Sequence, residues 1–342
     1  MASSFSPYRS LFLSFIIIFF NVSFALAVPS TGPEAQTNKS ILFISQDVKN
    51  GGITTLYRNF QTATNHLKWQ LQHENGFNDL LVIKSIINTK ARHYDALVLG
   101  GIAFSSVEEE ILGLQKEGVV VMGWHIFAEP GVYDNAVLNI ATKSKDVAKM
   151  AADYIINESN KEKGVVIIND KRFAVANAKT QKMADLVLAC SYCKLLEIVN
   201  VSISSARAKM PQLIIKLNNK YGKEWTHTLA INDVYFDDID FPLKQIKRQD
   251  IKNVAAGDGS INAFSRMKSG QSQQVATVSE PLALQGWQLA DELNRSFAKV
   301  PTSNFVSYPI LVDTDFLKTG GQFYRPGSSF HHEKQYLSVW FK

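Results

Sequence analysis

The chain alternates short, continuously apolar segments with amphipathic segments from about residue 40 to residue 312. Apolar segments of this kind are 41–45, 96–99, 119–122 and 164–168, each followed by polar residues or glycine. A strand that is apolar along its whole length is buried on both faces, as in a parallel sheet covered by helices on each side. The alternation therefore predicts an α/β fold of doubly wound parallel sheets.

More than ten such units follow one another, which is more than one sheet comfortably holds. A domain usually takes roughly 100–200 residues, so 342 residues predict two α/β lobes. Further strands are expected at 137–141, 195–199, 228–231, 254–256, 274–278 and 306–312. Helices are expected from residue 53 and at 78–91, 107–117, 146–157, 176–189, 211–221, 241–249 and 281–297, with Pro211 opening its helix.

The N-terminus has the features of a secretory signal. Arg9 precedes an apolar run at 11–20, and Ala25 and Ala27 supply the small residues of a cleavage site. The alternative is a membrane anchor, but the strongly apolar run is shorter than the roughly 20 residues that span a bilayer. We expect cleavage after Ala27, a mobile lead-in at 28–39 and a periplasmic mature protein.

Charge and motifs exclude several function classes. The 36 basic and 31 acidic residues give a net charge of +5 without a basic block, so no nucleic-acid partner is expected. Nucleophile-elbow, phosphate-loop, zinc-protease and dinucleotide motifs are absent from the sequence, so we expect neither an enzyme nor a cofactor. His331, His332 and Glu333 are in a terminal tail, where adjacent histidines are typically solvated, and no metal site is predicted there. We expect a monomer.

The only two cysteines, Cys190 and Cys193, stand three residues apart after a predicted helix. In an oxidising compartment this spacing favours a local structural disulfide. Redox catalysis is the alternative, but that motif usually opens a helix after a strand. The sequence alone leaves the oxidation state open.

Polar and aromatic residues follow five of the predicted strands. Because ligands bind beyond the carboxyl ends of parallel strands, these residues are candidates for a binding site. Carboxylates and amides bond hydroxyl groups, and aromatic faces pack on the C–H faces of sugar rings. A helix cap is the alternative role for each, and for Asn232 and Asp233 in particular. The candidates are Asp47, Asn50, Trp124, His125, Asn232, Asp233, Tyr235, Asp258 and Glu280.

Residues 40–315 resemble the type 1 periplasmic sugar-binding proteins of the ribose- and galactose-binding kind. The order and spacing of several short segments carry the resemblance. They are Ile41-Leu42-Phe43-Ile44-Ser45 running to Asn50, Tyr94-Asp95-Ala96-Leu97-Val98-Leu99, Val119-Val120-Val121, Gly123-Trp124-His125, Ala230-Ile231-Asn232-Asp233, Ala256-Gly257-Asp258-Gly259-Ser260 and Thr277-Val278-Ser279-Glu280.

The resemblance implies two lobes that close on a ligand, joined by three crossing segments near 140–141, 279–281 and 308. It divides the chain into a first lobe at 40–140 plus 281–308 and a second at 141–280 plus 309–315. The aromatic extension at 316–342 has no counterpart, and we expect it to pack on the body.

The implied function is a periplasmic solute receptor that delivers a carbohydrate-like ligand to an ABC permease. A sensory receptor signalling to a membrane kinase or chemoreceptor is the alternative. An exported α/β hydrolase is a remote alternative.

Carried over by position, Asn50, Asp258 and either Asn232 or Asp233 match ligand-binding residues of the family. Lys179 matches an arginine of the second lobe, and Glu280 matches a glutamine at a hinge crossing.

The chain also departs from the family pattern. Gly52 and Ile53 replace sugar-stacking phenylalanines, Trp124-His125 replaces an Asp-Arg pair, and Lys143-Ser144 replaces an Asp-Asn pair. Trp124 and Tyr235 are predicted to restore the stacking. Lys143 and Lys179 suggest the hypothesis of an acidic sugar or another small anion as ligand.

Overall fold

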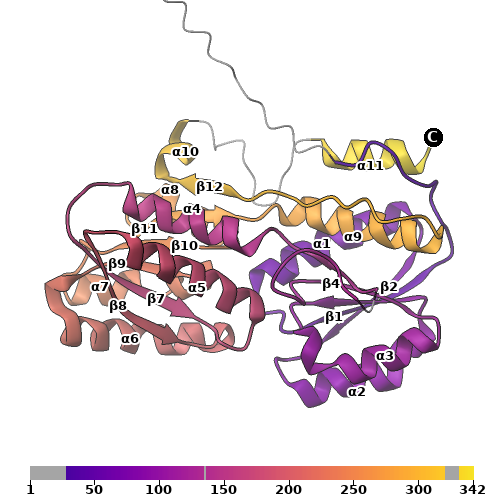
Figure 1. Ribbon diagram of the computed structural model, residues 1–342, viewed down its shortest axis with the longest axis horizontal. Coiled ribbons are helices and arrows are strands. Elements are labelled where there is room, and N and C mark those ends of the chain that lie inside the picture. Colours follow the sequence, from indigo (N-terminus) through magenta and orange to yellow (C-terminus); the bar gives the residue numbers. More distant parts are fainter. Residues whose placement is uncertain (1–27, 135, 320–330) are drawn as a thin grey trace, which may run out of the picture.

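The structure is a computed structural model that describes residues 28–134, 136–319 and 331–342. Two lobes lie side by side, each built on a six-stranded sheet (Figure 1). In the first lobe the strand order is β2-β1-β3-β4-β6-β5. Its elements are β1 (Ser40–Ser45), α1 (Gly51–His66), β2 (Gln70–Asn75), α2 (Leu80–Lys90), β3 (Ala96–Gly100), α3 (Glu108–Lys116), β4 (Val120–Trp124), β5 (Gly131–Val132) and β6 (Leu138–Ile140).

The second lobe repeats this topology, with strand order β12-β11-β10-β9-β7-β8. Its elements are α4 (Ser144–Ile156), β7 (Lys163–Asn169), α5 (Ala174–Ala189), β8 (Cys193–Asn200), α6 (Ala206–Tyr221), β9 (Trp225–Ala230), α7 (Asp240–Gln245), β10 (Lys252–Ala255), α8 (Ile261–Ser269), β11 (Gln274–Ser279), β12 (Ile310–Asp313) and α10 (Thr314–Thr319). The prediction of two doubly wound lobes is confirmed. One edge pairing in each sheet is antiparallel, β5 with β6 and β11 with β12.

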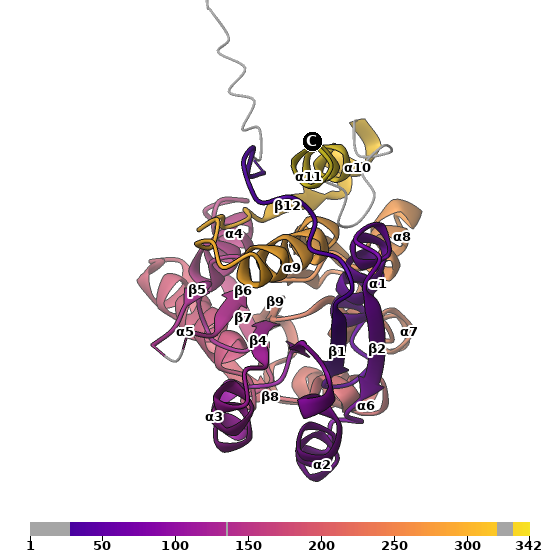
Figure 2. The ribbon, with the colours of Figure 1, turned by 90° about the vertical axis from the view of Figure 1, so that its right-hand side faces the viewer.

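The apolar strands bury both faces, as their composition predicts. In β1, Ile41 and Phe43 join the core that contains α1 and α9 (Leu282–Phe297). Leu42 and Ile44 point to the other face, into the core formed with α2 and α3. Figure 2 shows α1 and α9 above this sheet and α2 and α3 below it.

Three segments cross between the lobes, at the places the resemblance implies. The chain leaves the first sheet after β6 and enters the second lobe at α4. It returns after β11 to form α9, which packs on α1, and crosses back to pair β12 with β11. The exact division of residues between the lobes stays a prediction.

The C-terminal helix α11 (His332–Trp340) returns to the first lobe and packs on α9 (Figure 1). Tyr336 and Trp340 stack on Trp287 with ring centroids 6.3 and 5.6 Å away, and Trp340 Nε1 donates to Asp291 Oδ1 over 2.9 Å. The extension therefore packs on the body where the structure describes it. Phe323, Tyr324 and Phe330, also counted in that expectation, lie outside the described residues.

The lead-in, expected to be mobile, lies against the same two helices. The Ala35 N–H donates to the Trp340 carbonyl over 3.0 Å, and the Gln36 N–H donates to Asn294 Oδ1 over 2.8 Å. Gln335 Nε2 donates to the Val28 carbonyl over 2.9 Å. These bonds join the start of the described chain to its end.

Helices α6 and α7 differ from the expected bounds by more than two residues. Helix α6 begins at Ala206, so Pro211 lies inside it rather than at its start. Proline there removes one main-chain hydrogen bond, to the carbonyl four residues earlier. Helix α7 ends at Gln245, four residues before the predicted end. Cys190 and Cys193 form the expected disulfide between α5 and β8.

None of the helices in the described part of the chain combines the length and apolar character needed to cross a membrane. The predicted signal at 1–27 lies outside that part, so its cleavage stays a prediction.

Candidate functional site

A pocket lies between the lobes, beyond the carboxyl ends of strands from both sheets. It has about 40 Å³ of space for water-sized molecules, within a wider outline of about 400 Å³ that includes its opening to solvent. Parallel sheets with this strand order bind ligands in such a crevice. Residues of both lobes line it: Asn50, Gly101, Trp124, His125, Phe173, Val175, Ala176, Lys179, Ile203, Ile231, Asn232 and Asp258.

Asn50 and Asn232 each cap a helix and also line the pocket. Asn50 Oδ1 accepts the N–H of Gly52 over 2.9 Å at the start of α1. Asn232 Oδ1 accepts the N–H of Val234 over 3.0 Å, and its Nδ2 donates to Asp258 Oδ2 over 2.7 Å. Capping was the alternative to binding for Asn232, and the structure shows the cap. Because the amide nitrogen points away from the cap toward Asp258 and the residue lines the pocket, binding stays a prediction alongside it.

Asp258 reaches from the second lobe to the start of α1 in the first. A Cβ atom on Gly52 would stand 2.5 Å from Asp258 Oδ2, so the absence of a side chain at Gly52 permits this approach. Any larger side chain at position 52 would collide with the carboxylate as it is placed here.

Glu280 connects the lobes from beneath the pocket. It is fully buried, and Lys179 Nζ of α5 donates to its Oε1 over 2.8 Å. Its Oε2 lies 3.0 Å from His125 Nε2 at the end of β4 and accepts a bond of 2.6 Å from Thr142 Oγ1 in the crossing after β6. With these partners Glu280 positions Lys179 and His125 rather than lining the pocket itself.

The pKa values of Asp258 and Glu280, both buried, are shifted in opposite directions. Burial raises the pKa of Asp258 to about 6, a rise that the charge of Lys179 only partly offsets. Burial also opposes the charge of Glu280, but Lys179 and His125 hold its pKa well below the ordinary value. Lys179 is therefore matched by Glu280, and the hypothesis of an acidic ligand held by Lys179 loses its main support.

Trp124 and His125 lie against each other at the wall of the first lobe. Their rings stack with centroids 3.8 Å apart, and the backbone of His125 is left-handed at a φ of 55°. Trp124 Nε1 donates to Gln285 Oε1 of α9 over 2.8 Å. With its nitrogen bonded inside the first lobe, Trp124 offers the pocket only an apolar ring.

Four other predicted residues do not line the pocket. Asp47 borders a smaller cavity beside it. Asp233 is buried and accepts the N–H groups of Gly259 and Ser260 over 2.8 and 3.0 Å. Tyr235 lies in the core of the second lobe, where its hydroxyl donates to the Val201 carbonyl over 2.6 Å, so it is not placed to stack on a ligand. Lys143 is exposed at the start of α4.

The structure adds lining residues that the sequence interpretation missed. Phe173, Val175 and Ala176 come from the start of α5, and Ile203 follows β8. Their position could have identified them, because these residues also follow predicted strands within a few positions.

At the mouth of the pocket the lobes touch through Asn78. Arg172 Nη1 donates to Asn78 Oδ1 over 2.9 Å, and Asn78 Nδ2 donates to Ser204 Oγ over 3.3 Å. Arg172 is itself held by bonds to Asp170, with Nε to Oδ1 at 2.8 Å. Polar groups of the two lobes therefore close over the pocket.

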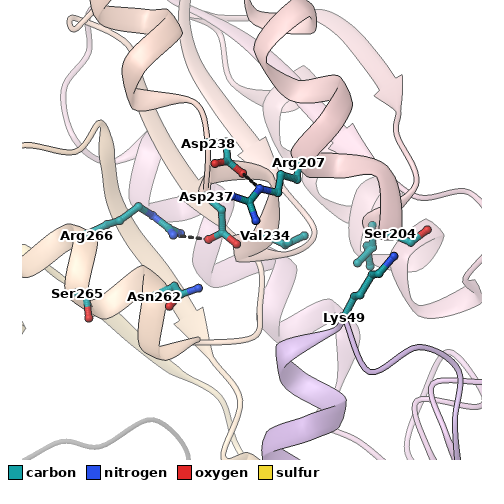
Figure 3. A pocket seen from close by; sticks show the side chains of 10 residues that line it. Lys49, Ser204, Arg207, Val234, Asp237, Asp238, Asn262, Ser265 and Arg266 are labelled. Carbon is teal, nitrogen blue, oxygen red and sulfur yellow. Dashed lines mark hydrogen bonds and ion pairs between the residues drawn. The ribbon is translucent and has the colours of Figure 1, made fainter. Parts of the chain in front are cut away.

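Figure 3 shows a wider cavity outside this mouth, with Lys49 of the first lobe facing Ser204 and Arg207 of the second. Asp238 lies 3.6 Å from Arg207, and Asp237 is paired with Arg266. Each of these two acidic groups already has a cationic partner. The cavity has the character of a solvated rim, and the pocket behind it is the better candidate for a ligand site.

No protein-family model matches this chain, and no curated protein matches it in sequence. Solved structures do match its fold. An ABC transporter solute-binding protein from Agrobacterium vitis, with bound allitol, is 14% identical, with 84% of this chain and 99% of that chain covered at a TM-score of 0.73.

A sugar ABC transporter protein from Yersinia enterocolitica is 14% identical over 89% of this chain and 94% of its own, at a TM-score of 0.76. The Caulobacter myo-inositol binding protein, bound to myo-inositol, is 14% identical, with 84% of this chain and 98% of that chain covered at a TM-score of 0.72. These likenesses establish the two-lobe fold.

Proposed function

We propose that this chain, which has the fold of sugar-transporter solute-binding proteins, is an exported receptor that closes on a small, neutral, carbohydrate-like ligand. It would then present the closed form to an ABC permease. The fold neighbours include proteins with bound allitol and myo-inositol, both polyhydroxylated molecules. That likeness supports the ligand class, and the pocket supports it independently.

The observation that carries the proposal is the meeting of polar groups from both lobes in one pocket. Asn50 and His125 come from the first lobe, and Lys179, Asn232 and Asp258 from the second. Amides and a carboxylate bond hydroxyl groups in fixed directions, and a few such groups suffice to orient a small ligand.

Closure follows from this division of the site. A ligand bonded to both lobes binds the closed form more tightly than the open one, and so shifts the population toward closure. Asp258 accepts hydrogen bonds from ligand hydroxyl groups. The charge of Lys179 is already neutralised by Glu280 and needs no charged ligand. A neutral ligand then fits better than an anion.

Thermal-shift screening of the mature protein, from residue 28, tests the proposal. Sugars, sugar acids, polyols and amino acids are compared at millimolar concentration, because a ligand that binds only the folded state raises its melting temperature. We expect shifts with neutral sugars or polyols, and their loss in Asn232→Ala and Asp258→Asn. Shifts confined to sugar acids would contradict the neutral ligand, and shifts confined to amino acids would contradict the carbohydrate class.

A further inference from the structure

The pocket divides into a polar part and an apolar part. Four of the polar groups are bonded in two sets: Asn232 donates to Asp258, and Lys179 and His125 share Glu280. We call the five pocket-lining polar residues the floor: Asn50, His125, Lys179, Asn232 and Asp258.

Most of the apolar lining comes from two neighbouring segments of the second lobe, while Trp124 and Ile231 lie beside the polar residues. Phe173, Val175 and Ala176 lie at the start of α5, and Ile203 lies in the 3₁₀ helix that follows β8. We call these four residues the collar. Their side chains carry no hydrogen-bonding group, and Phe173, Val175 and Ala176 are at most 9% exposed.

The collar adjoins both the floor and the mouth. Phe173 and Ile203 line the pocket and also the smaller adjoining cavity, whose wall includes Asn50 of the floor and Arg172 and Ser204 of the mouth. Lys179 of the floor stands one helical turn after Ala176 on α5. A molecule that fills the pocket therefore contacts both the floor and the collar.

We propose, resting on the function above, that the ligand is a sugar or polyol with an apolar substituent, such as a deoxy or alkyl group. The hydroxylated end binds the floor, and the substituent occupies the collar. A hydroxyl group in the collar would lose its water and meet no side-chain partner, which disfavours a ligand that is hydroxylated at every carbon. An alkyl group there buries apolar surface instead.

Isothermal titration calorimetry with matched pairs tests this. D-Ribose, D-xylose and D-galactose are each compared with their methyl and n-butyl glycosides, and with the deoxy sugar lacking the terminal hydroxyl. At least one substituted member should bind about tenfold or more tightly than its parent, in keeping with roughly 0.8 kcal/mol per buried CH₂. If the parents bind as tightly as every substituted member, the collar inference fails and the proposed function stands. If neither parents nor substituted members bind, both fail.

Two isosteric variants test whether the collar causes the preference for the substituted ligand. Val175→Thr places a hydroxyl in the collar, and we expect the preference for the substituted ligand to fall at least fivefold. Val187→Thr is the control, because Val187 lies on the same helix and in the same core but does not line the pocket. Because the readout is the ratio of two affinities in one variant, a general loss of stability does not affect it. An unchanged ratio in Val175→Thr, or an equal fall in Val187→Thr, would overturn the assignment.

Discussion

At the scale of single residues, Glu280 determines how the site is organised. Its carboxylate holds Lys179 of the second lobe, His125 of the first and Thr142 of a crossing segment. A buried charge without partners is strongly unfavourable, so each of these contacts depends on the others. Glu280 neutralises a buried lysine and leaves Asp258 as the pocket's own carboxylate.

We expect Glu280→Gln to lower the free energy of unfolding by about 3 kcal/mol, because it leaves Lys179 buried without a counter-ion. Glu280→Gln combined with Lys179→Met removes both charges and should recover at least half of that loss. Urea unfolding of the wild type, both single variants and the double variant gives the coupling energy. Strictly additive losses would show that the two side chains do not act as a pair.

Asp258 gives the protein a specific dependence on pH. Its pKa is raised to about 6 in the folded state, first of all by burial, and is close to 3.9 in an unfolded chain. The folded state therefore holds a proton that the unfolded state has lost, and stability falls as pH rises from about 4 to about 6. The difference amounts to about 3 kcal/mol.

The neutral variant Asp258→Asn lacks this contribution. The unfolding free energy of the wild type, relative to Asp258→Asn, should decline between pH 4 and 6 and remain constant above pH 7. Urea unfolding at intervals of half a pH unit measures this difference. Subtracting the unfolding free energy of the variant from that of the wild type cancels the contribution of groups that titrate in both proteins. A difference that rises with pH would mean that the folded protein favours ionised Asp258.

At the scale of helices and strands, the fold was largely predictable and the site only partly so. Continuous apolar strands identify the parallel sheets because each strand must bury both faces. Helix α8 was missed although Ser260 caps it through Oγ to the Ala263 N–H and Gly270 ends it at a φ of 65°. These were signals that sequence inspection could have used.

The direction of side chains in the loops was not predictable. Tyr235 follows β9 as a binding residue would, but the 3₁₀ helix Asp233–Phe236 turns it into the core. Lys143 was a candidate through its position, but it lies exposed where α4 begins. Local sequence places a residue after a strand, whereas tertiary packing decides which way its side chain points.

Helix α11 provides the test at this scale. Trp340→Ala removes a buried ring that stacks on Trp287 and donates to Asp291, and it should lower the free energy of unfolding by about 3–5 kcal/mol. The adjacent Phe341 is 52% exposed, so Phe341→Ala should change the free energy of unfolding by less than about 0.5 kcal/mol. Thermal and urea unfolding compare the two. Equal, small effects would mean that α11 does not stay docked on α9 in solution.

At the scale of the whole molecule, two sets of contacts join the lobes. One set lies at the floor, where Glu280 holds partners from both lobes, and the other lies at the mouth, where Asn78 meets Arg172 and Ser204. The floor contacts are buried, whereas Asn78 and Arg172 meet near solvent. In the proposed closure, the mouth contacts would break and form as the lobes move, while the buried contacts of Glu280 would persist.

Asn78→Gly isolates the mouth contacts. Asn78 has a φ of 57°, which glycine adopts freely, so the variant removes the side chain without straining the loop. Each lost bond is worth about 0.5–1.5 kcal/mol, so the ratio of closed to open molecules should fall about fivefold or more. Fluorescence energy transfer between dyes on exposed positions of the two lobes measures that ratio. The control is Phe77→Gly, at a neighbouring left-handed position that is 70% exposed. If both variants show the distance distribution of the wild type, the bonds of Asn78 do not hold the lobes together and closure depends on the floor alone.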